Sequence, residues 1–391
     1  MKVGISVAEA QQIVLDACPV LGCETVASVD AQGRVLAAPV ISGRTLPPAD
    51  CSAMDGYAVR AEDLAAASEA APVELSVVFE VAAGGQGERP LVAGEAARIF
   101  TGAPIPPGAD SVVIQEDTSA RGDRVEVQVA PQPGENIREA GEDIRRGDAV
   151  LEVGTLLGPA QLGMLASLGR SLVQVHQRPM VAILSGGDEL VDPDGDAAGG
   201  RIVSSNTYSL AAQCRAAGAE PINLGIARDT PEDLERLLQS GLRADFLVSS
   251  AGVSVGDHDY VRPVLEKLGC RLLFWGVKMK PGYPLAFGHF DPEVGPFVFG
   301  LPGNPVSTLV TFEQFVRPAL RKLAGHRRWF RPRIEVELAE DFRKKAGRLH
   351  YVRVLLERRG ATVAARSTGN QSSGVLASMT RAHGLLVFPA E

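Results

Sequence analysis

The sequence predicts a multidomain α/β protein: a three-layer α/β/α domain with a mostly parallel sheet, an N-terminal mixed domain with an inserted β-module, and a small C-terminal β-domain. Three observations predict this class. A chain of 391 residues is too long for one ordinary core. From about residue 178, continuously apolar strands alternate with helices, which is typical of a parallel sheet covered on both faces. Two other stretches, 50–140 and 333–389, show short or alternating strands between turns rich in Pro and Gly.

The first elements predict the N-terminal mixed domain. Ser6 and Glu9 have the spacing of a capping box, so a helix begins there. Residues 24–42 indicate a hairpin or an extended arm. A second helix is expected at 154–169 and would pack on the first, which makes the β-module between them an insertion.

The α/β part opens with the strand "MVAILS" at 180–185. A helix follows and stops at Gly218, because glycine readily adopts the left-handed conformation that ends helices. The next helix has Thr230 as N-cap, Pro231 at its first position and Asp233 at its third.

A long helix at about 306–325 closes the α/β part, and the alternation after it indicates a β-domain. The predicted domains are 1–50 with 140–177 (mixed), 51–139 (β-module), 178–327 (α/β) and 328–391 (C-terminal β-domain).

Composition excludes several classes of protein. The net charge of −8 argues against nucleic acid as a partner. There is no apolar run long enough to span a bilayer and no secretory signal, so we expect a cytoplasmic protein without a membrane partner. The five cysteines are scattered without metal-binding spacing, and we expect reduced thiols.

Four polar loops follow strands of the predicted α/β sheet, at 185–190, 225–230, 249–259 and 301–307. In such sheets ligands bind outside the carboxyl ends of the strands. Glycine-rich turns before helices suit phosphate, whereas carboxylates repel it unless a divalent cation such as Mg²⁺ lies between. The acids that could hold Mg²⁺ are Glu189, Asp229, Asp257 and Asp259, and Lys278 and Lys280 supply positive charge. The loops therefore predict a site for a phosphorylated ligand with a metal ion.

Each loop also has a simpler structural explanation. Asp and Gly form turns far more often than they bind ligands. The stretch "GDHDY" at 256–260 could cap the next helix, and "PGNP" at 302–305 is an ordinary rigid turn. His258 and His289 are expected to be solvated or packed. The convergence of four such loops on one sheet edge favours the ligand site, and the sequence lacks the HExxH, GxSxG and Walker motifs of other chemistries.

Long motifs extend over nearly the whole chain: "CSAMDGYAVR" (51–60), "SAGVSVGDHDYV" (250–261), and "KPGYPLAFG" with "LPGNPVS" (280–307). Together with "RIFTGAPIPPGAD" (98–110) and "GENIREAGEDIRRGD" (134–148), they resemble the molybdopterin molybdenumtransferase family, of the bacterial MoeA and gephyrin E-domain type. The resemblance implies a four-domain homodimer that transfers molybdenum from molybdate into adenylylated molybdopterin, with Mg²⁺ required and AMP released.

The resemblance also implies site residues. The catalytic acids would be Asp55, Asp143, Glu189, Asp229 and Asp259. The substrate-binding residues would be Thr101, Gly252, Ser254, Gly256, Lys280, Pro302, Asn304, Pro305, Ser307, Arg353 and Ser373, with Arg353 and Ser373 linked to molybdate. In such a homodimer Asp55 and Asp143 would face the loops at 185–190 and 249–259 of the other subunit. The molybdopterin adenylyltransferase and the acceptor molybdoenzymes are the implied protein partners.

Three positions depart from the family pattern. Gly186 replaces a threonine, Ala251 replaces a common glycine, and Tyr283 stands where a second basic residue often follows "KPG". Two other classes stay open, an adenylyltransferase whose single domain resembles 178–325 and a scaffold protein. The motifs at 51–60 and 134–148 argue against the first, and no additional domain supports the second.

Overall fold

The computed structural model describes residues 1–85, 89–250, 260–291 and 295–391, and its contacts divide them into two compact units. Unit 1 consists of Met1–Ala38, Val153–Gly163 and Arg170–Glu391. Unit 2 consists of Pro39–Glu152 and Met164–Gly169. None of the helices in the described ranges has the length and apolarity needed to span a bilayer.

The centre of unit 1 is a seven-stranded sheet with the order β1-β19-β21-β22-β18-β14-β17. The strands from β17 through β14 and β18 to β22 run parallel, as do β1 and β19, whereas β21 is antiparallel to both its neighbours. The prediction of a mostly parallel sheet is therefore confirmed. The strands are β1 (Lys2–Ile5), β14 (Met180–Gly186), β17 (Glu220–Ala227), β18 (Phe246–Ser249), β19 (Arg271–Val277), β21 (Ala286–His289) and β22 (Phe297–Gly300).

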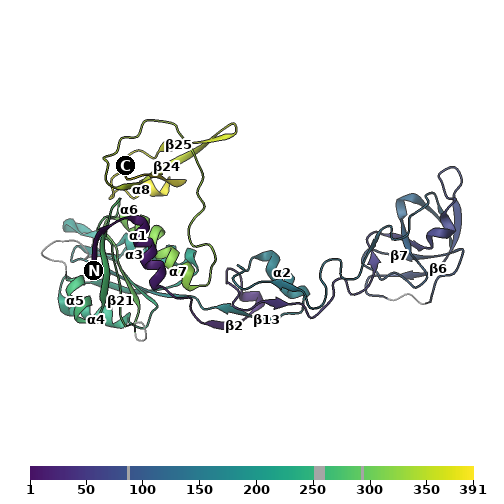
Figure 1. The fold of residues 1–391 in the computed structure, drawn as a ribbon, viewed down its shortest axis with the longest axis horizontal. Helices are drawn as coiled ribbons and strands as arrows, with labels where there is room; N and C mark the ends of the chain where they lie inside the picture. The colour runs from purple at the N-terminus through teal and green to yellow at the C-terminus, as the bar shows by residue number, and fades with distance from the viewer. Residues whose placement is uncertain (86–88, 251–259, 292–294) are drawn as a thin grey trace. The chain divides into compact units, whose positions relative to one another are not determined.

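Helices cover both faces of this sheet (Figure 1). On β18, Phe246 and Val248 enter one apolar layer and Leu247 enters the other, because successive side chains of a strand point to opposite faces. The first layer is completed by α1 (Val7–Ala17), α3 (Ser205–Ala217) and α6 (Pro305–Thr311), and the second by α4 (Pro231–Ser240) and α5 (Val261–Lys267). The predicted three-layer arrangement is confirmed.

The predicted helix boundaries agree with the observed caps. Ser6 Oγ accepts a hydrogen bond from the N–H of Glu9 at 3.1 Å. Thr230 Oγ1 accepts from the N–H of Asp233 at 3.4 Å, and Gly218 ends α3 with a φ of +88°. The two N-cap bonds satisfy N–H groups of the first helical turn that have no partner within the helix itself.

The first helix packs on the α/β sheet, not on α2 (Pro159–Ser167) as the sequence suggested. β1 extends the sheet by pairing in parallel with β19, with Lys2 opposite Phe274. Val7 and Val14 of α1 are buried in the first apolar layer. The N-terminal residues therefore complete the α/β domain from the far end of the sequence.

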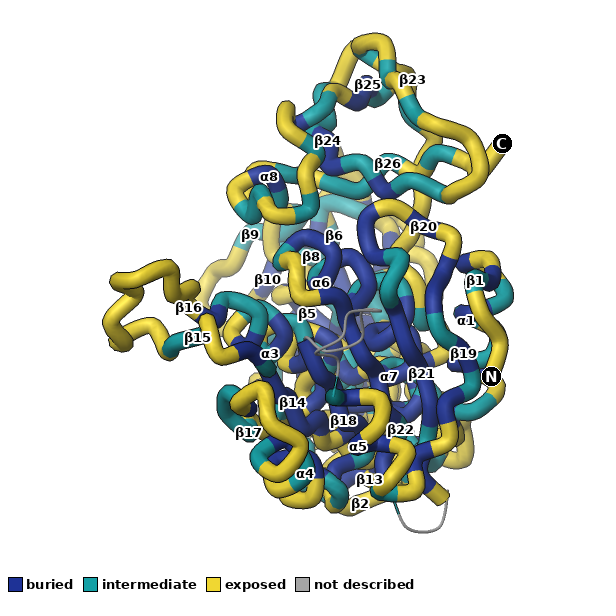
Figure 2. The backbone as a smooth tube through the Cα atoms, turned by 90° about the vertical axis from the view of Figure 1, so that its left-hand side faces the viewer, coloured by how far each residue is buried: buried dark blue, intermediate teal, exposed yellow. Residues whose placement is uncertain are grey.

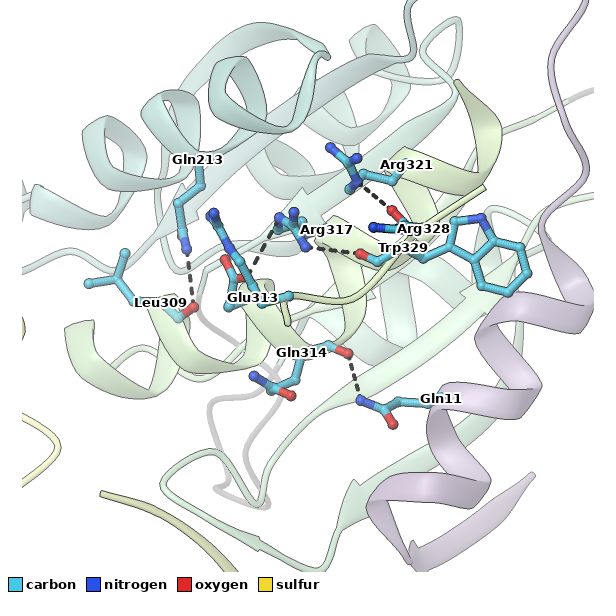
Figure 3. Close-up of polar contacts among 10 residues, drawn as sticks. Gln11, Gln213, Leu309, Glu313, Gln314, Arg317, Arg321, Arg328 and Trp329 are labelled. Carbon is cyan, nitrogen blue, oxygen red and sulfur yellow. Dashed lines mark hydrogen bonds and ion pairs between the residues drawn. The ribbon is translucent and has the colours of Figure 1, made fainter. Parts of the chain in front are cut away.

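The helix predicted at 306–325 is built of α6, the π-helical segment η5 (Phe312–Val316) and α7 (Arg317–Leu323). Pro318 has no N–H and cannot donate to the carbonyl of Gln314, four residues earlier. Gln11 of α1 donates its Nε2 to that carbonyl at 3.1 Å (Figure 3). The irregular turn is thus stabilised from the neighbouring helix.

Two arginines of α7 fix the chain that leaves this helix (Figure 3). Arg317 donates to the carbonyl of Trp329 and Arg321 donates to the carbonyl of Arg328, both at 2.9 Å. The start of the segment that leads to the C-terminal domain therefore follows the surface of the helix.

Two short ribbons extend from unit 1. β2 (Cys23–Ala27) pairs with β13 (Leu172–His176), so β2 pairs with a distant segment of the chain rather than in a local hairpin. β15 (Leu190–Val191) pairs with β16 (Ile202–Val203), and Figure 2 shows the exposed loop between them in yellow. Short η1 (Ser28–Asp30) and η4 (Ala198–Gly200) lie beside these strands in the sequence.

The C-terminal sheet has the order β20-β24-β25-β23, and β26 also pairs with β24. Its strands are β23 (Glu337–Leu338), β24 (Leu349–Arg359), β25 (Thr362–Ser367) and β26 (Gly384–Phe388), with α8 (Ala377–Thr380) beside them. β20 (Met279–Lys280) comes from the α/β part of the chain and pairs with β24. Tyr351 of β24 is buried in the first apolar layer of the α/β domain.

Unit 2 contains the predicted β-module. A six-stranded sheet has the order β8-β5-β7-β6-β10-β9. Its strands are β5 (Gly56–Val59), β6 (Val73–Val81), β7 (Glu95–Ile99), β8 (Ser111–Ile114), β9 (Thr118–Arg121) and β10 (Arg124–Val127), with η2 (Ala61–Leu64) and η3 (Gln115–Asp117) between them. Two further pairs join β3 (Val40–Ile41) to β12 (Ala149–Leu151) and β4 (Cys51–Ser52) to β11 (Ile137–Arg138).

Candidate functional site

The carboxyl ends of the parallel strands β14, β17, β18 and β22 meet at one edge of the seven-stranded sheet. Ser250 donates its N–H to the carbonyl of Leu184 at 2.9 Å, and Leu301 donates to the carbonyl of Ser249 at 2.7 Å. These bonds join the segments that follow three of the strands. The predicted convergence of the loops is thus observed wherever they are described.

Buried hydroxyl groups underlie this edge. Ser185 Oγ is 2.7 Å from Thr207 Oγ1 and 2.9 Å from Ser250 Oγ. Ser204 Oγ lies 3.3 Å from Ser185 Oγ and 3.1 Å from Thr207 Oγ1. All four side chains are buried. A fully satisfied buried network of this kind fixes the strand ends relative to α3.

Two acids face each other across the loops that follow β14 and β17. The N–H of Asp188 donates to Asp229 Oδ2, and the N–H of Asp229 donates to Asp188 Oδ1, both at 3.3 Å. Both residues are exposed. Each carboxylate thus accepts one long hydrogen bond from the backbone of the other residue, and carboxylate oxygens have lone pairs for further partners. A hard cation is the kind of ligand that such oxygens suit.

Glu189 adds a third carboxylate to these loops, and Gly187 makes room for it. Gly187 has a φ of +140°, and a Cβ there would lie 2.4 Å from Glu189 Oε2. Glycine therefore serves both the backbone conformation and the placement of the Glu189 carboxylate.

The fourth loop leads into α6. Thr308 Oγ1 donates to the carbonyl of Pro302 at 2.5 Å, and Asn206 of α3 donates to the carbonyl of Gly303 at 2.8 Å. Val306 donates its N–H to the carbonyl of Ser373 in the C-terminal domain at 3.1 Å. The structure thereby brings together five of the predicted residues: Pro302, Asn304, Pro305, Ser307 and Ser373.

Arg353 of β24 is a buried arginine, only 1% exposed. Its guanidinium donates to Ser378 Oγ and to the carbonyl of Ser372, both at 3.1 Å, and to the carbonyl of Asn370 at 3.4 Å. All these partners are neutral, and burial lowers the pKa of the arginine. A desolvated guanidinium without a carboxylate among these partners is suited to an anion.

Lys280 lies on the other face of the C-terminal sheet from Arg353. It is opposite His350 in the β20–β24 register, and Arg353 is three positions further along β24. The pKa of His350 is lowered by burial and then by the nearby charges of Lys280, Lys344 and Arg348. Positive charge is therefore concentrated on the Lys280 face, separately from Arg353.

Tyr283 is one of the departures from the family pattern, and a cation covers its ring. The Arg348 guanidinium lies 4.6 Å from the ring centroid, and Trp275 makes an edge contact at 5.8 Å. The residue after "KPG" is thus uncharged here, but the C-terminal domain brings a positive charge to it. Gly186, which also departs from the family pattern, is the last residue of β14, opposite Ala227.

In unit 2, Asp55 and Thr101 are in direct contact. Asp55 Oδ1 accepts hydrogen bonds from the N–H and from the Oγ1 hydroxyl of Thr101, both at 2.7 Å. These two bonds lower the pKa of Asp55, and the charge of Arg98 contributes further. The carboxylate is exposed, ionised and oriented by its partner.

Asp143 lies on a separate turn of unit 2. Its N–H donates to the carbonyl of Leu46 at 3.2 Å, and its side chain is exposed. The neighbouring Ala140 donates to Asp50 Oδ1 at 2.8 Å. This turn is therefore joined to the segment that precedes Asp55.

Several predicted site residues lie outside the described part of the chain: Gly252, Ser254, Gly256, Asp257 and Asp259. Ala251, which departs from the family pattern, also lies outside it. Among the residues that are described, no group of three or more His, Cys, Asp or Glu is placed to hold a metal ion. Of the four predicted Mg²⁺ ligands, Glu189 and Asp229 can be located. Their carboxylate oxygens are the donors that Mg²⁺ prefers.

Sequence reasoning missed Asp188 and the hydroxyl network. Asp188 precedes Glu189 directly, and two consecutive acids at the end of a strand were a detectable signal. The hydroxyl groups gave no such signal, because serines near strand ends and helix starts are ordinary turn and cap residues.

Comparison with known proteins assigns the three parts of the chain. Residues 5–169 match the family described as MoeA N-terminal region (domain I and II). Residues 182–322 match the probable molybdopterin binding domain, and residues 335–391 match the MoeA C-terminal region (domain IV).

The chain is similar to relatives over nearly its full length. It is 42% identical over 368 residues to a molybdopterin molybdenumtransferase of Nostoc sp., covering 92% of this chain and 83% of the relative. It is 36% identical over 367 residues to one of Haemophilus influenzae, covering 93% and 88%. The crystal structure of the molybdopterin biosynthesis moeA protein of Pyrococcus horikoshii OT3 superposes with a TM-score of 0.83 at 31% identity, covering 99% of this chain and 96% of that one. The chain belongs to the MoeA family of molybdopterin molybdenumtransferases.

Proposed function

We propose that this protein is a molybdopterin molybdenumtransferase that inserts molybdenum from molybdate into adenylylated molybdopterin and releases AMP, in the biosynthesis of the molybdenum cofactor. One observation carries the proposal: in a chain of this family, a carboxylate pair stands at the carboxyl edge of the α/β sheet and a buried arginine contacts neutral groups. The acids suit a cation that accompanies phosphate, and the arginine suits an oxyanion.

The acids at the sheet edge would hold Mg²⁺. We assign Glu189 and Asp229 to this role together with Asp257 and Asp259. Mg²⁺, when bound, supplies positive charge against the phosphate oxygens as AMP leaves. Gly187 and the hydroxyl network support the Glu189 loop, and the N–H of Gly187 donates to the carbonyl of Ala227, two residues before Asp229.

The oxyanion sites divide between the two faces of the C-terminal sheet. We assign molybdate to Arg353 and the Ser373 segment, next to the turn that contains Pro302, Asn304, Pro305 and Ser307. Lys280, on the opposite face, would contact a phosphate of the pterin substrate. Removing Lys280 by substitution with Ala should weaken binding of that substrate by about 1.5–3 kcal/mol, as for a lost charge-assisted hydrogen bond.

Unit 2 would contribute Asp55, Thr101 and Asp143 to the reaction. We propose that they act in a homodimer, in which the acids of one subunit serve the loops of its partner. Mixing Asp55→Asn subunits with Asp229→Asn subunits should then restore activity, because mixed dimers contain one intact site. A protein that is monomeric by light scattering and fully active would contradict this assembly.

The activity is tested by incubating the purified protein with adenylylated molybdopterin, molybdate and Mg²⁺ and measuring AMP by chromatography. AMP release should depend on all three. An ATP-dependent formation of adenylylated molybdopterin from molybdopterin, without molybdate-dependent AMP release, would instead indicate an adenylyltransferase.

A further inference from the structure

Arg98 of β7 connects the chain segments that surround Asp55. It lies opposite Tyr57 in the antiparallel β5–β7 register. Its guanidinium is 5.0 Å from the centroid of the Tyr57 ring and 5.2 Å from that of Phe100. The side chain is therefore held between one ring that follows Asp55 in sequence and one that precedes Thr101.

The two ends of the guanidinium make different hydrogen bonds. Nη1 donates to the carbonyl of Gly56, directly after Asp55, at 3.2 Å. Nη2 donates to Gln115 Oε1 at 2.8 Å, and the N–H of Gln115 donates to the carbonyl of Asp55 at 3.0 Å. One side chain thus fixes the backbone that directly follows the Asp55 Cα, directly at the Gly56 carbonyl and through Gln115 at the Asp55 carbonyl.

The close packing of β5 against β8 restricts the backbone next to Asp55. A Cβ on Gly56 would lie 1.9 Å from the carbonyl of Val113 in β8, so β5 and β8 approach more closely than another residue would allow. Gln115, which directly follows β8, lies next to Asp55. The described partners of Arg98 include two carbonyl oxygens and two aromatic rings, and its positive charge contributes to the lowered pKa of Asp55.

We propose that Arg98 is a positioning residue for the transfer reaction: it holds the Asp55 carboxylate and its partner Thr101 in one fixed arrangement. This inference rests on the proposed role of Asp55. Arg98 itself touches the groups that orient Asp55 and is not assigned a contact with substrate.

The central test compares Arg98→Met with Arg98→Lys in the full-length protein. Methionine keeps the apolar packing between the rings but removes the charge and both hydrogen bonds. We expect kcat for AMP release to fall roughly 10- to 100-fold, the range typical of residues that orient a reacting group, with much smaller changes in KM. Lysine keeps the charge and can serve one acceptor at a time, so its kcat should lie between those of Arg98→Met and the unmodified protein.

The matched control is Arg124→Met in the same β-module. Arg124 pairs on the surface with Glu74, and its loss should leave kcat and KM unchanged. Melting temperature and near-UV circular dichroism are measured on every variant. If Arg98→Met does not fold, Arg98→Lys decides the question, because unchanged kcat in a folded lysine variant would overturn the proposal.

A double-mutant cycle separates positioning from a general structural effect. If Arg98 acts through Asp55, Arg98→Met should cause no further loss of kcat in an Asp55→Asn background. A full additional loss in that background would overturn the proposal. Normal kcat in Asp55→Asn alone would instead refute the proposed role of Asp55, whereas an inactive Asp55→Asn with a normal Arg98→Met refutes only the role of Arg98.

Discussion

Asp55 of the β-module accepts two 2.7 Å hydrogen bonds from Thr101, whereas Asp229 at the edge of the α/β sheet faces Asp188 through reciprocal contacts of 3.3 Å. The first carboxylate is already oriented by the protein, and its charge is stabilised. The second accepts a longer bond, from the backbone N–H of another acidic residue. The difference teaches that exposed acids of one chain can be held to different degrees by the protein's own donors, and in the proposed reaction Asp229 is the acid that would pair with an added cation.

The largest expected effect comes from Asp229→Asn. The change keeps the size of the side chain but removes the charge that would hold Mg²⁺, so AMP release should fall about 100-fold or more. High Mg²⁺ concentration should restore part of the loss. Asp196→Asn, in the exposed loop between β15 and β16, is the control, and a loss equal to that of the control would refute the role of Asp229.

A smaller effect is expected from Thr101→Val, which removes one of the two hydrogen bonds to Asp55. The folded-state pKa of Asp55 is lowered by these bonds, so the ionised form is lost only as pH falls through that lowered value. In the variant the pKa rises, and the acidic limb of the pH–rate profile should move to higher pH. Turnover at neutral pH should fall about 10-fold.

The control for Thr101→Val is Ser68→Ala, which removes a hydroxyl from an exposed turn of the same module. Its pH profile should match that of the unmodified protein. An acidic limb that stays in place in Thr101→Val would mean that Asp55 does not govern it.

Gly187→Ala tests whether the sheet-edge acids depend on their backbone. The new Cβ would meet the Glu189 carboxylate, and the φ of +140° is unfavourable for alanine. We expect a loss of about 1–3 kcal/mol in unfolding free energy, measured by urea denaturation, with a severalfold weaker response to Mg²⁺. Gly303→Ala, where a Cβ would meet nothing within 4 Å, is the comparison, and equal losses would contradict this account.

The smallest effect is expected from Asp188→Asn. It removes a like charge beside Asp229, so unfolding free energy should rise by roughly 0.2–1 kcal/mol while AMP release stays near normal. A loss of activity as large as that of Asp229→Asn would make Asp188 an equal partner in the site and remove the distinction between the two acids.

Local patterns predicted the α/β domain well. The caps at Ser6 and Thr230, the stop at Gly218 and the strand at 180–185 all follow from interactions within a few residues. The pairing of β1 with β19 could not be predicted in this way, because four residues at the N-terminus meet a strand that lies near residue 274. The pairing of β20 with β24 of the C-terminal sheet could not be predicted either, because the two strands are far apart in the sequence.

Candidate site residues could be predicted from the sequence where they are carboxylates that follow buried strands. Glu189 and Asp229 were chosen because carboxylates follow buried strands, and the structure places both on neighbouring loops. Asp55 and Thr101 were assigned to the site from family resemblance, but their contact was not predicted, since the two residues are far apart in sequence. Arg98 gave no signal, because its role depends on the register of β5 with β7 and on two aromatic rings.

The pairing of β20, from the α/β part of the chain, with the C-terminal sheet has a consequence for how the protein unfolds. β20 pairs with β24, and the neighbouring Tyr351 enters the core of the α/β domain. Loss of the C-terminal sheet would therefore uncover apolar surface in that core and leave β20 without its partner strand. The two form a single cooperative block, and a chain shortened before residue 328 would be a damaged α/β domain rather than an independent one.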